Sequence, residues 1–303
     1  MSRIPERNDR KSGGKTAAGS SFRGRSGPGG KGSKGSSDKG GWAPRATEPN
    51  PAAPPRPGRG KIDADQLIWG RHPVLAALSN PARQGMGRLL ATPDRAAELE
   101  REGLATGRAV EVVDPQALER MLPQGAVHQG LVFKVQPLEG VALDDLAEPA
   151  QGVIVMLDQL TDPQNVGAIF RSALAFGARG IVVQDRHSPV LAGALAKAAA
   201  GATERLPCAR VTNLSRALER LADLGWRAVG LDGASEETLE AALDERPTVL
   251  VMGSEGDGIR RLVAEHCDVL AKIPMPGGFE SLNVSNAAAI ALYEATRKQR
   301  PLD

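Results

Sequence analysis

Residues 152–157, Gly-Val-Ile-Val-Met-Leu, form a continuous apolar run, and the largely polar residues 158–165, Asp-Gln-Leu-Thr-Asp-Pro-Gln-Asn, follow them. An apolar run of this length is typical of a strand buried on both faces, as in parallel sheets that helices cover. A helix is predicted over residues 165–176, and Gly177 ends it before the apolar residues 181–183. This order of strand, helix and strand predicts a parallel α/β arrangement.

The same alternation continues toward the end of the chain. Further strands are predicted at residues 209–211, 228–231, 249–252 and 269–273, and further helices at residues 194–200, 214–221, 238–243, 259–265 and 284–297. Asn213 can cap the helix that follows it, whose apolar side chains recur at helical spacing. Together these elements predict an α/β domain over residues 152–303, with a mostly parallel sheet and helices on both of its faces.

A smaller α/β domain is predicted upstream, over residues 66–137. Its strands are expected at residues 88–91, 110–113 and 131–135, and its helices at residues 73–78, 94–102 and 115–121. Residues 138–151, in which acidic and small side chains predominate, are expected to form a linker between the two domains.

Residues 1–65 are expected to form a disordered basic arm. Gly, Ser, Pro, Lys and Arg dominate this segment, so it has too little apolar surface to offset the entropy of ordering. Residues 1–60 carry 13 Lys or Arg against 4 Asp or Glu, whereas the remaining residues carry 25 against 32. A basic arm on an acidic body favours a polyanionic partner such as RNA, although a flexible solubilising tail would have the same composition.

The composition disfavours several classes of protein. Cys208 and Cys267 lie far apart in apolar surroundings, as free thiols in a reducing compartment would. The chain shows no signal peptide and no apolar run of membrane-spanning length, so a soluble cytoplasmic protein without a membrane partner is expected. None of the four histidines has metal-ligand spacing and no nucleophile-elbow motif occurs, so neither a metal site nor a catalytic triad is expected.

Three polar clusters follow strands of the predicted parallel sheet, at residues 158–172, 253–258 and 274–286. Ligands of open parallel sheets bind at the carboxyl ends of the strands, so three clusters at one edge favour a ligand pocket. Taken singly, each cluster could be a tight turn or a helix cap. The clusters supply amides, hydroxyls, arginine and glutamate, which suit a reaction that depends on positioning two bound partners.

The three clusters resemble the motifs of the SpoU (TrmH) family of SPOUT RNA methyltransferases. Residues 165–173, Asn-Val-Gly-Ala-Ile-Phe-Arg-Ser-Ala, resemble the first motif, and residues 251–256, Val-Met-Gly-Ser-Glu-Gly, resemble the second. The third corresponds to residues 273–287, which end in Ser-Leu-Asn-Val-Ser-Asn-Ala. Upstream, residues 68–75 and 127–130 resemble the bounds of the substrate-binding domain that precedes the catalytic domain in many members.

The resemblance implies a SPOUT domain with a trefoil knot, S-adenosylmethionine as methyl donor and no metal. The donor contacts expected from it are made by Gly253, Ile273 and Leu282 through main-chain groups, with Met252, Pro274 and Met275 as apolar walls. The catalytic residues expected from it are Asn165, Arg171, Glu255, Ser281 and Asn283. Because a guanidinium keeps its proton, Arg171 is expected to hold an RNA phosphate and to lower the pKa of the ribose hydroxyl by its charge. Glu255 would orient Arg171 or Asn165, and Ser281 with Asn283 would position the ribose.

The implied reaction is methylation of a ribose 2′-hydroxyl, with a guanosine of 23S ribosomal RNA as the target, either free or in a pre-ribosomal particle. The alternative within the family is a transfer RNA 2′-O-methyltransferase. A non-catalytic RNA-binding ribosome-assembly factor would have lost Arg171, Glu255 or Asn283, and all three are present. A dinucleotide-dependent oxidoreductase would need a Gly-x-Gly-x-x-Gly fingerprint, which residues 253–258 lack. Members of the family are usually dimers, so a homodimer is expected.

Overall fold

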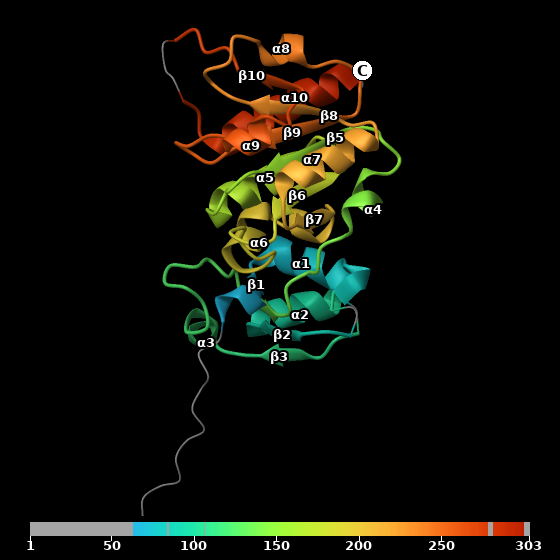
Figure 1. The fold of residues 1–303 in the computed structure, drawn as a ribbon. Helices are drawn as coiled ribbons and strands as arrows, with labels where there is room; N and C mark the ends of the chain where they lie inside the picture. The colour runs from blue at the N-terminus through green and yellow to red at the C-terminus, as the bar shows by residue number, and fades with distance from the viewer. Residues whose placement is uncertain (1–62, 84, 106, 278–280, 300–303) are drawn as a thin grey trace, which may run out of the picture. The chain divides into compact units, whose positions relative to one another are not determined.

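The structure is a computed structural model that describes residues 63–83, 85–105, 107–277 and 281–299. The described residues belong to one compact unit, in which the strands form two separate sheets (Figure 1). Residues 1–62 of the expected basic arm lie outside the described residues. No described helix is both long enough and apolar enough to cross a membrane.

The four-stranded sheet contains the first strands of the chain. In spatial order its strands are β1 (Leu67–Trp69), β4 (Leu131–Lys134), β2 (Arg88–Ala91) and β3 (Val110–Val112). Strand β4 is antiparallel to both of its neighbours, whereas β2 and β3 are parallel. The helical elements of this domain are α1 (Arg71–Ser79), α2 (Pro93–Arg101) and α3 (Pro115–Glu119), with the short 3₁₀ helices η1 (Ala64–Gln66) and η2 (Pro81–Arg83). Strand β1 is absent from the sequence prediction, because three buried residues are too short a pattern to distinguish a strand from a helix.

The six-stranded sheet is entirely parallel, which confirms the predicted arrangement. In spatial order its strands are β10 (Val269–Ala271), β8 (Arg227–Leu231), β9 (Thr248–Met252), β5 (Val153–Leu157), β6 (Gly180–Gln184) and β7 (Cys208–Val211). Every residue of the central strands β5 and β9 is buried, as the continuous apolar runs predict.

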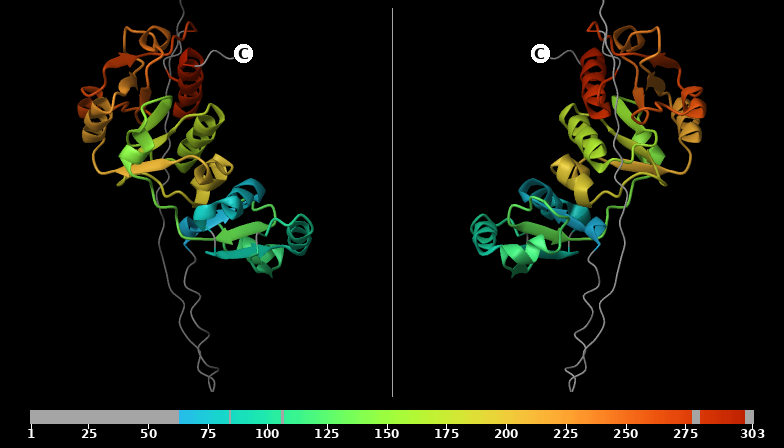
Figure 2. Two further views of the ribbon diagram at one scale, coloured as in Figure 1. Left: turned by 90° about the vertical axis from the view of Figure 1, so that its right-hand side faces the viewer. Right: turned by 90° about the vertical axis from the view of Figure 1, so that its left-hand side faces the viewer.

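Helices cover both faces of the six-stranded sheet. The helices on one face pack against the odd-numbered residues of β5. They are α5 (Pro163–Ala175), α6 (Gly193–Ala199), α8 (Leu239–Ala242) and α10 (Val284–Gln299), together with η3 (Ala202–Glu204). On the other face the helices share a core with the even-numbered residues of β5, and they are α4 (Leu143–Ala147), α7 (Leu214–Asp223) and α9 (Arg261–Ala264). Figure 2 shows α5 and α10 on the same side of the sheet.

The segment expected to act as a linker, residues 138–151, contains helix α4. Leu146 and Ala147 of this helix are buried in the core of the six-stranded domain. The indole N–H of Trp226 donates a hydrogen bond of 3.0 Å to the Ala147 carbonyl. Part of the segment therefore packs with the second domain.

A buried ion pair connects η2, in the first domain, with η3, in the second. The Nε atom of Arg83 lies 2.7 Å from Oε2 of Glu204, and only 3% and 1% of the two side chains are exposed. Arg83 Nη2 donates to the other Glu204 oxygen at 3.0 Å, and Arg83 Nη1 donates to the Gln136 carbonyl at 2.7 Å. Asn80 Nδ2 also donates to Glu204, at 2.8 Å. These contacts join the two domains through a fully paired charge.

The segment between β10 and α10 runs from Lys272 to Asn283 and contains most of the third predicted cluster. Residues 278–280 within it lie outside the described residues. The trefoil knot implied by the resemblance depends on the path of this segment, and it stays a prediction.

Candidate active site

A pocket of about 1110 Å³ lies at the carboxyl ends of β8, β9 and β10, at the sheet edge where the sequence predicts one. Its lining consists of the residues that follow these strands and of the start of α10: Leu231, Asp232, Gly233, Ala234, Met252, Gly253, Ser254, Glu255, Gly256, Gly258, Ala271, Lys272, Ile273, Pro274, Met275, Pro276, Ser281, Leu282, Val284 and Ala287. All six residues expected to contact the methyl donor are among them. Their contacts with a donor stay a prediction.

The loop after β9 folds back on itself and forms one wall of the pocket. The N–H of Ser254 donates to the Gly258 carbonyl at 3.1 Å, and the N–H of Gly258 donates to the Ser254 carbonyl at 3.0 Å. A Cβ atom on Gly253 would lie 1.9 Å from the carbonyl carbon of Gly258. Only glycine therefore fits at the first position of this loop, because the main chain of Gly258 packs directly against it.

Three side chains from the three sequence clusters meet at the edge of this pocket. The Oε1 atom of Glu255 accepts hydrogen bonds from Asn165 Nδ2 at 3.2 Å, from Asn283 Nδ2 at 2.9 Å and from the Val284 N–H at 3.3 Å. Asn283 Nδ2 also donates to Asn165 Oδ1 at 2.9 Å. One carboxylate oxygen thus fixes both amides, and the hypothesis that Glu255 orients Asn165 agrees with this geometry.

Local capping explains why Asn165 and Asn283 stand at this edge. Asp162 caps α5 by accepting the N–H groups of Gln164 and Asn165, which places Asn165 in the first turn of the helix. The Oδ1 atom of Asn283 accepts the N–H of Ser285 at 2.9 Å and its hydroxyl at 2.5 Å, just where α10 begins. The two amides are therefore fixed by the starts of two helices that pack side by side.

Arg171 does not join this cluster. It lies further along α5, is exposed, and makes no hydrogen bond or ion pair within the part of the chain that the structure describes. Because an α-helix turns roughly 100° per residue, six residues place Arg171 roughly 120° around the helix from Asn165. Of the two partners considered for Glu255, the structure shows Asn165 alone. Ser281 lines the pocket, beside Leu282.

Sequence reasoning missed the pocket residues that follow β8, together with Lys272. Asp232, Gly233 and Ala234 line the pocket, and the N–H of Ala234 donates to Asp232 Oδ1 at 2.9 Å. Strand β8 matches the predicted strand at 228–231, and its carboxyl end lies at the same edge as those of β9 and β10. The rule that ligands bind at the carboxyl ends of strands was therefore the available signal for these residues.

Neither cysteine has the properties of a reactive thiol. Both are unpaired, and burial raises the pKa of each thiol to about 12. Among the residues that the structure describes, no three His, Cys, Asp or Glu side chains come together as a metal site requires.

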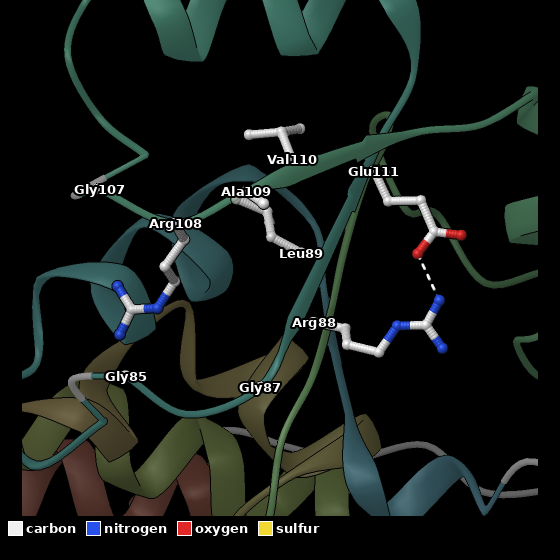
Figure 3. A pocket seen from close by; sticks show the side chains of 9 residues that line it. All are labelled: Gly85, Gly87, Arg88, Leu89, Gly107, Arg108, Ala109, Val110 and Glu111. Atoms are coloured by element: carbon white, nitrogen blue, oxygen red, sulfur yellow. Dashed lines mark hydrogen bonds and ion pairs between the residues drawn. The ribbon is translucent and has the colours of Figure 1, made fainter.

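A second pocket, of about 430 Å³, lies in the small domain at one end of β2 and β3 (Figure 3). It is lined by Gly85, Gly87, Arg88, Leu89 and residues 107–111. Arg88 Nη2 lies 2.5 Å from Glu111 Oε2 in an ion pair between the two strands. Arg108 lies over the ring of Phe133, with 5.5 Å to the centroid, and donates to the Arg83 carbonyl at 2.5 Å. Arg108 thus connects the loop before β3 to β4 and to η2, whereas the Arg88–Glu111 pair is exposed.

Two protein-family models match the chain. The model described as the SpoU rRNA methylase family matches residues 152–293. The model described as RNA 2′-O ribose methyltransferase substrate binding matches residues 67–141. The first match contains the candidate site, and the second contains the four-stranded sheet.

Relatives from mycobacteria match most of the chain. A protein of Mycolicibacterium smegmatis named as an uncharacterized tRNA/rRNA methyltransferase is 40% identical over 253 residues, which cover 81% of this chain and 80% of that protein. A protein of Mycobacterium avium with the same name is 37% identical over 306 residues, which cover 97% of this chain and 99% of that protein.

Solved structures with a similar fold contain the methyl donor. The SpoU methyltransferase AviRb from Streptomyces viridochromogenes in complex with AdoMet matches with a TM-score of 0.64 and 28% identity, over 77% of this chain and 89% of that chain. An AdoMet-bound rRNA methyltransferase from Sinorhizobium meliloti matches with a TM-score of 0.62 and 25% identity, over 76% of this chain and 86% of that chain.

Proposed function

The chain belongs to the SpoU family of AdoMet-dependent RNA ribose methyltransferases, and we propose that it methylates the 2′-hydroxyl of a guanosine in 23S ribosomal RNA. The observation that carries the proposed site is the cluster of Asn165, Glu255 and Asn283 at the edge of the pocket. The proposed RNA is supported by the rRNA methylase description of the family model and by the separate substrate-binding domain. This substrate would be met in the cytoplasm.

The pocket suits an adenosine-containing donor. Gly253, Ile273 and Leu282 all line the pocket, and their main-chain groups are proposed to contact the donor. Met252, Pro274 and Met275 supply apolar walls for a flat base. When bound there, S-adenosylmethionine would supply an electrophilic methyl group, activated by the positive charge on the sulfur that carries it.

The residues of the chain act mainly by positioning. Asn283 uses both of its amide hydrogens and both lone pairs of its oxygen within the protein, so it serves to hold Asn165 and Glu255. The second hydrogen of the Asn165 amide and Glu255 Oε2 make no hydrogen bond with the described residues. We propose that these two groups, with Ser281, align the ribose hydroxyl with the methyl group.

Arg171 is proposed to act in a second copy's site. It is exposed on α5, and no described residue of its own chain binds it. Helix α10 packs beside α5 (Figure 2). It exposes 40% of Ile290 and 42% of Tyr293, and the Tyr293 ring packs edge-on against Phe176 with 6.0 Å between the ring centroids. Such apolar groups on an outer face are available for a homodimer contact. The partner's guanidinium would then bind the RNA phosphate and stabilise the alkoxide as the proton leaves to phosphate or solvent.

Methyl transfer from labelled S-adenosylmethionine to unmodified 23S ribosomal RNA, compared with a transfer RNA pool, tests the proposed substrate. The expected result is label on one 2′-O-methylguanosine of the 23S RNA. Label on transfer RNA would favour the second candidate, which the tRNA/rRNA names of the mycobacterial relatives leave open. No label on either RNA, from a protein that binds the donor, would favour a pre-ribosomal particle as the substrate. The basic residues 1–60 are proposed to raise RNA affinity without reading sequence.

A further inference from the structure

Asp158 and Arg260 form a partly buried ion pair that none of the roles assigned above uses. The side chain of Asp158 has no exposed surface, whereas 39% of the Arg260 side chain is exposed. Asp158 Oδ2 accepts the N–H of Arg260 at 2.8 Å. Asp158 Oδ1 accepts the Nε–H of Arg260 at 2.7 Å and lies 2.6 Å from its Nη2. The same Nη2 donates to Gln184 Oε1 at 3.0 Å. The guanidinium is therefore held in one orientation.

Asp158 is joined to both ends of the loop that carries Gly253 and Glu255. Its own N–H donates to the Met252 carbonyl at 2.8 Å, at the residue before the loop starts. Its carboxylate holds Arg260, two residues after the main-chain bonds that close the loop at Gly258. The loop is thus fixed at its beginning and at its end by a single residue.

Asp158 also begins the segment that leads to Asn165. It is the first residue after β5, and Gln159 next to it has a left-handed φ of 57°, so the chain turns sharply there. The segment ends at Asp162, which caps α5 and places Asn165. The segment that supplies Glu255 and the segment that supplies Asn165 therefore both begin at Asp158, the first at a hydrogen bond to its main-chain N–H and the second as its direct continuation. A shift of Asp158 would move one against the other.

We propose that Asp158 and Arg260 are positioning residues, which set the loop at residues 253–258 against the start of α5 for methyl transfer. A buried ion pair is weak support for a purely stabilising role, because apolar side chains of similar volume often stabilise a core as well or better. Ionic and hydrogen-bonding contacts fix direction, which apolar contacts do not. The inference rests on the proposed donor pocket and the proposed role of Glu255.

The experiment compares Arg260→Gln and Arg260→Lys with the wild-type protein and with Arg220→Gln. Arg220 forms a two-pronged contact with Asp144, at 3.0 and 2.9 Å, on the opposite side of the sheet from α5 and outside the pocket, so it is a matched control. The dissociation constant of S-adenosylmethionine is measured by calorimetry, and the methyl-transfer rate by single turnover at saturating donor and RNA. Thermal melting of each variant defines a working temperature at which it is folded.

For Arg260→Gln the donor should bind about 10-fold more weakly and the single-turnover rate should fall about 10- to 100-fold. The reason is that a small displacement of the groups that position the substrate lowers the rate strongly. Arg260→Lys keeps the charge but not the planar fork, so it should show the same changes at smaller size. Arg220→Gln should keep the wild-type dissociation constant for the donor and the wild-type methyl-transfer rate. A merely structural role would lower the amount of folded protein without changing the donor affinity of the folded fraction.

Wild-type donor affinity and rate in folded Arg260→Gln would overturn the inference. If Arg260→Gln does not fold, Arg260→Lys decides in the same way. A wild-type protein that fails to bind S-adenosylmethionine would overturn the proposed pocket, and this inference with it. A wild-type protein that binds the donor and methylates RNA, beside Arg260 variants that do the same, would leave the proposed function intact and refute the positioning role alone.

Discussion

The network around Glu204 and the cluster around Glu255 are built from the same kinds of side chain but differ in how they are completed. At Glu204 both carboxylate oxygens accept hydrogen bonds from Arg83, and Asn80 adds a third donor. At Glu255 all contacts with the described residues go to Oε1, and none goes to Oε2. The first carboxylate is buried and the second is exposed at the pocket edge.

The difference is between a carboxylate whose partners all lie within the protein and one that keeps an oxygen without a partner among the described residues. The protein itself satisfies the charge at Glu204, so that network can only hold the two domains together. The cluster at Glu255 leaves an oxygen and an amide hydrogen for another molecule, and Arg171 is exposed on the same helix as Asn165. A substrate site needs hydrogen-bonding groups that are held in place but have no partner within the protein, because the substrate supplies that partner.

The largest effect is expected on the free energy of unfolding, when the hydrogen-bond network around Glu204 is broken. Glu204→Ala leaves Arg83 buried without its partner, so the free energy of unfolding should fall by about 3–5 kcal/mol. Urea denaturation followed by circular dichroism measures this loss. Glu111→Ala removes the exposed partner of Arg88 and should cost less than about 1 kcal/mol. Equal losses in the two variants would show that the Glu204 network has no special structural role.

Removing the exposed arginine should affect catalysis and leave folding unchanged. Arg171→Ala is expected to lower the single-turnover rate by about 100- to 1000-fold, the range for loss of a group that stabilises developing charge. Its unfolding free energy should stay within about 0.5 kcal/mol of wild type, because no described residue depends on it. Arg171→Lys should recover only part of the rate, since a lysine lacks the planar fork. Near-full activity of Arg171→Lys would refute two-pronged phosphate binding.

Mixed chains test whether Arg171 serves a second copy. Arg171→Ala and Glu255→Ala chains are refolded together, so that a mixed dimer contains one site with both residues intact. Recovery of up to about a quarter of wild-type activity is expected from random pairing. No recovery above the separate variants, in a mixture shown to contain mixed dimers, would place Arg171 in its own chain's site.

A smaller change is expected when the acceptor at the pocket edge is altered. Glu255→Ala removes the atom that holds Asn165 and Asn283, so the single-turnover rate should fall about 100-fold. Glu255→Gln keeps an amide oxygen that can accept the same bonds, so it should lose about 10-fold. If both variants lose the same factor, the negative charge of Glu255 matters and its acceptor geometry does not.

The smallest effect is expected at an exposed pair. His266 Nε2 lies 3.0 Å from Glu219 Oε1, and the hydrogen bond to the Leu262 carbonyl, followed by that to Glu219, raises the pKa of His266 above its ordinary value. The resulting stabilisation is fully present below the unfolded pKa of about 6.5 and is lost as the pH rises through the folded pKa. His266→Gln should therefore lower the melting temperature slightly at about pH 5.5 and leave it unchanged at about pH 9. A loss of equal size at both pH values would exclude the charged pair as its cause.

The sequence predicted the six-stranded domain well because its central strands are continuous apolar runs. Strands at residues 181–183 and 249–252 were placed within one or two residues of β6 and β9. Asn213 was predicted as a helix cap, and its Oδ1 accepts the N–H of Arg216. Helix α9 is shorter than the predicted 259–265, because the main chain of Arg260 is extended where its N–H binds Asp158. A contact across more than one hundred residues leaves no local pattern.

The sequence predicts a pocket at the sheet edge where the structure has one, but it does not predict the contacts within the candidate site. Carboxyl ends of parallel strands lie at one edge, so the three clusters had to be neighbours. The hydrogen bonds between Glu255 and the two amides depend on the paths of two loops. The spacing of residues in the sequence does not predict those paths. The separation of Arg171 from Asn165 could have been calculated from helical periodicity, because both residues lie on one helix.

The order of strands in the six-stranded sheet constrains how the chain folds during synthesis. Strand β5 pairs with β6 on one side and with β9 on the other, and β9 ends at Met252. The ribosome therefore releases β5, β6 and β7 long before the strand that completes the middle of the sheet exists. Until then one edge of a fully apolar strand has no partner, and closing that gap is slow because the pairing residues are distant in sequence. Synthesis of this chain thus includes an interval in which the unpaired edge of β5 is open to pairing with a strand of another chain.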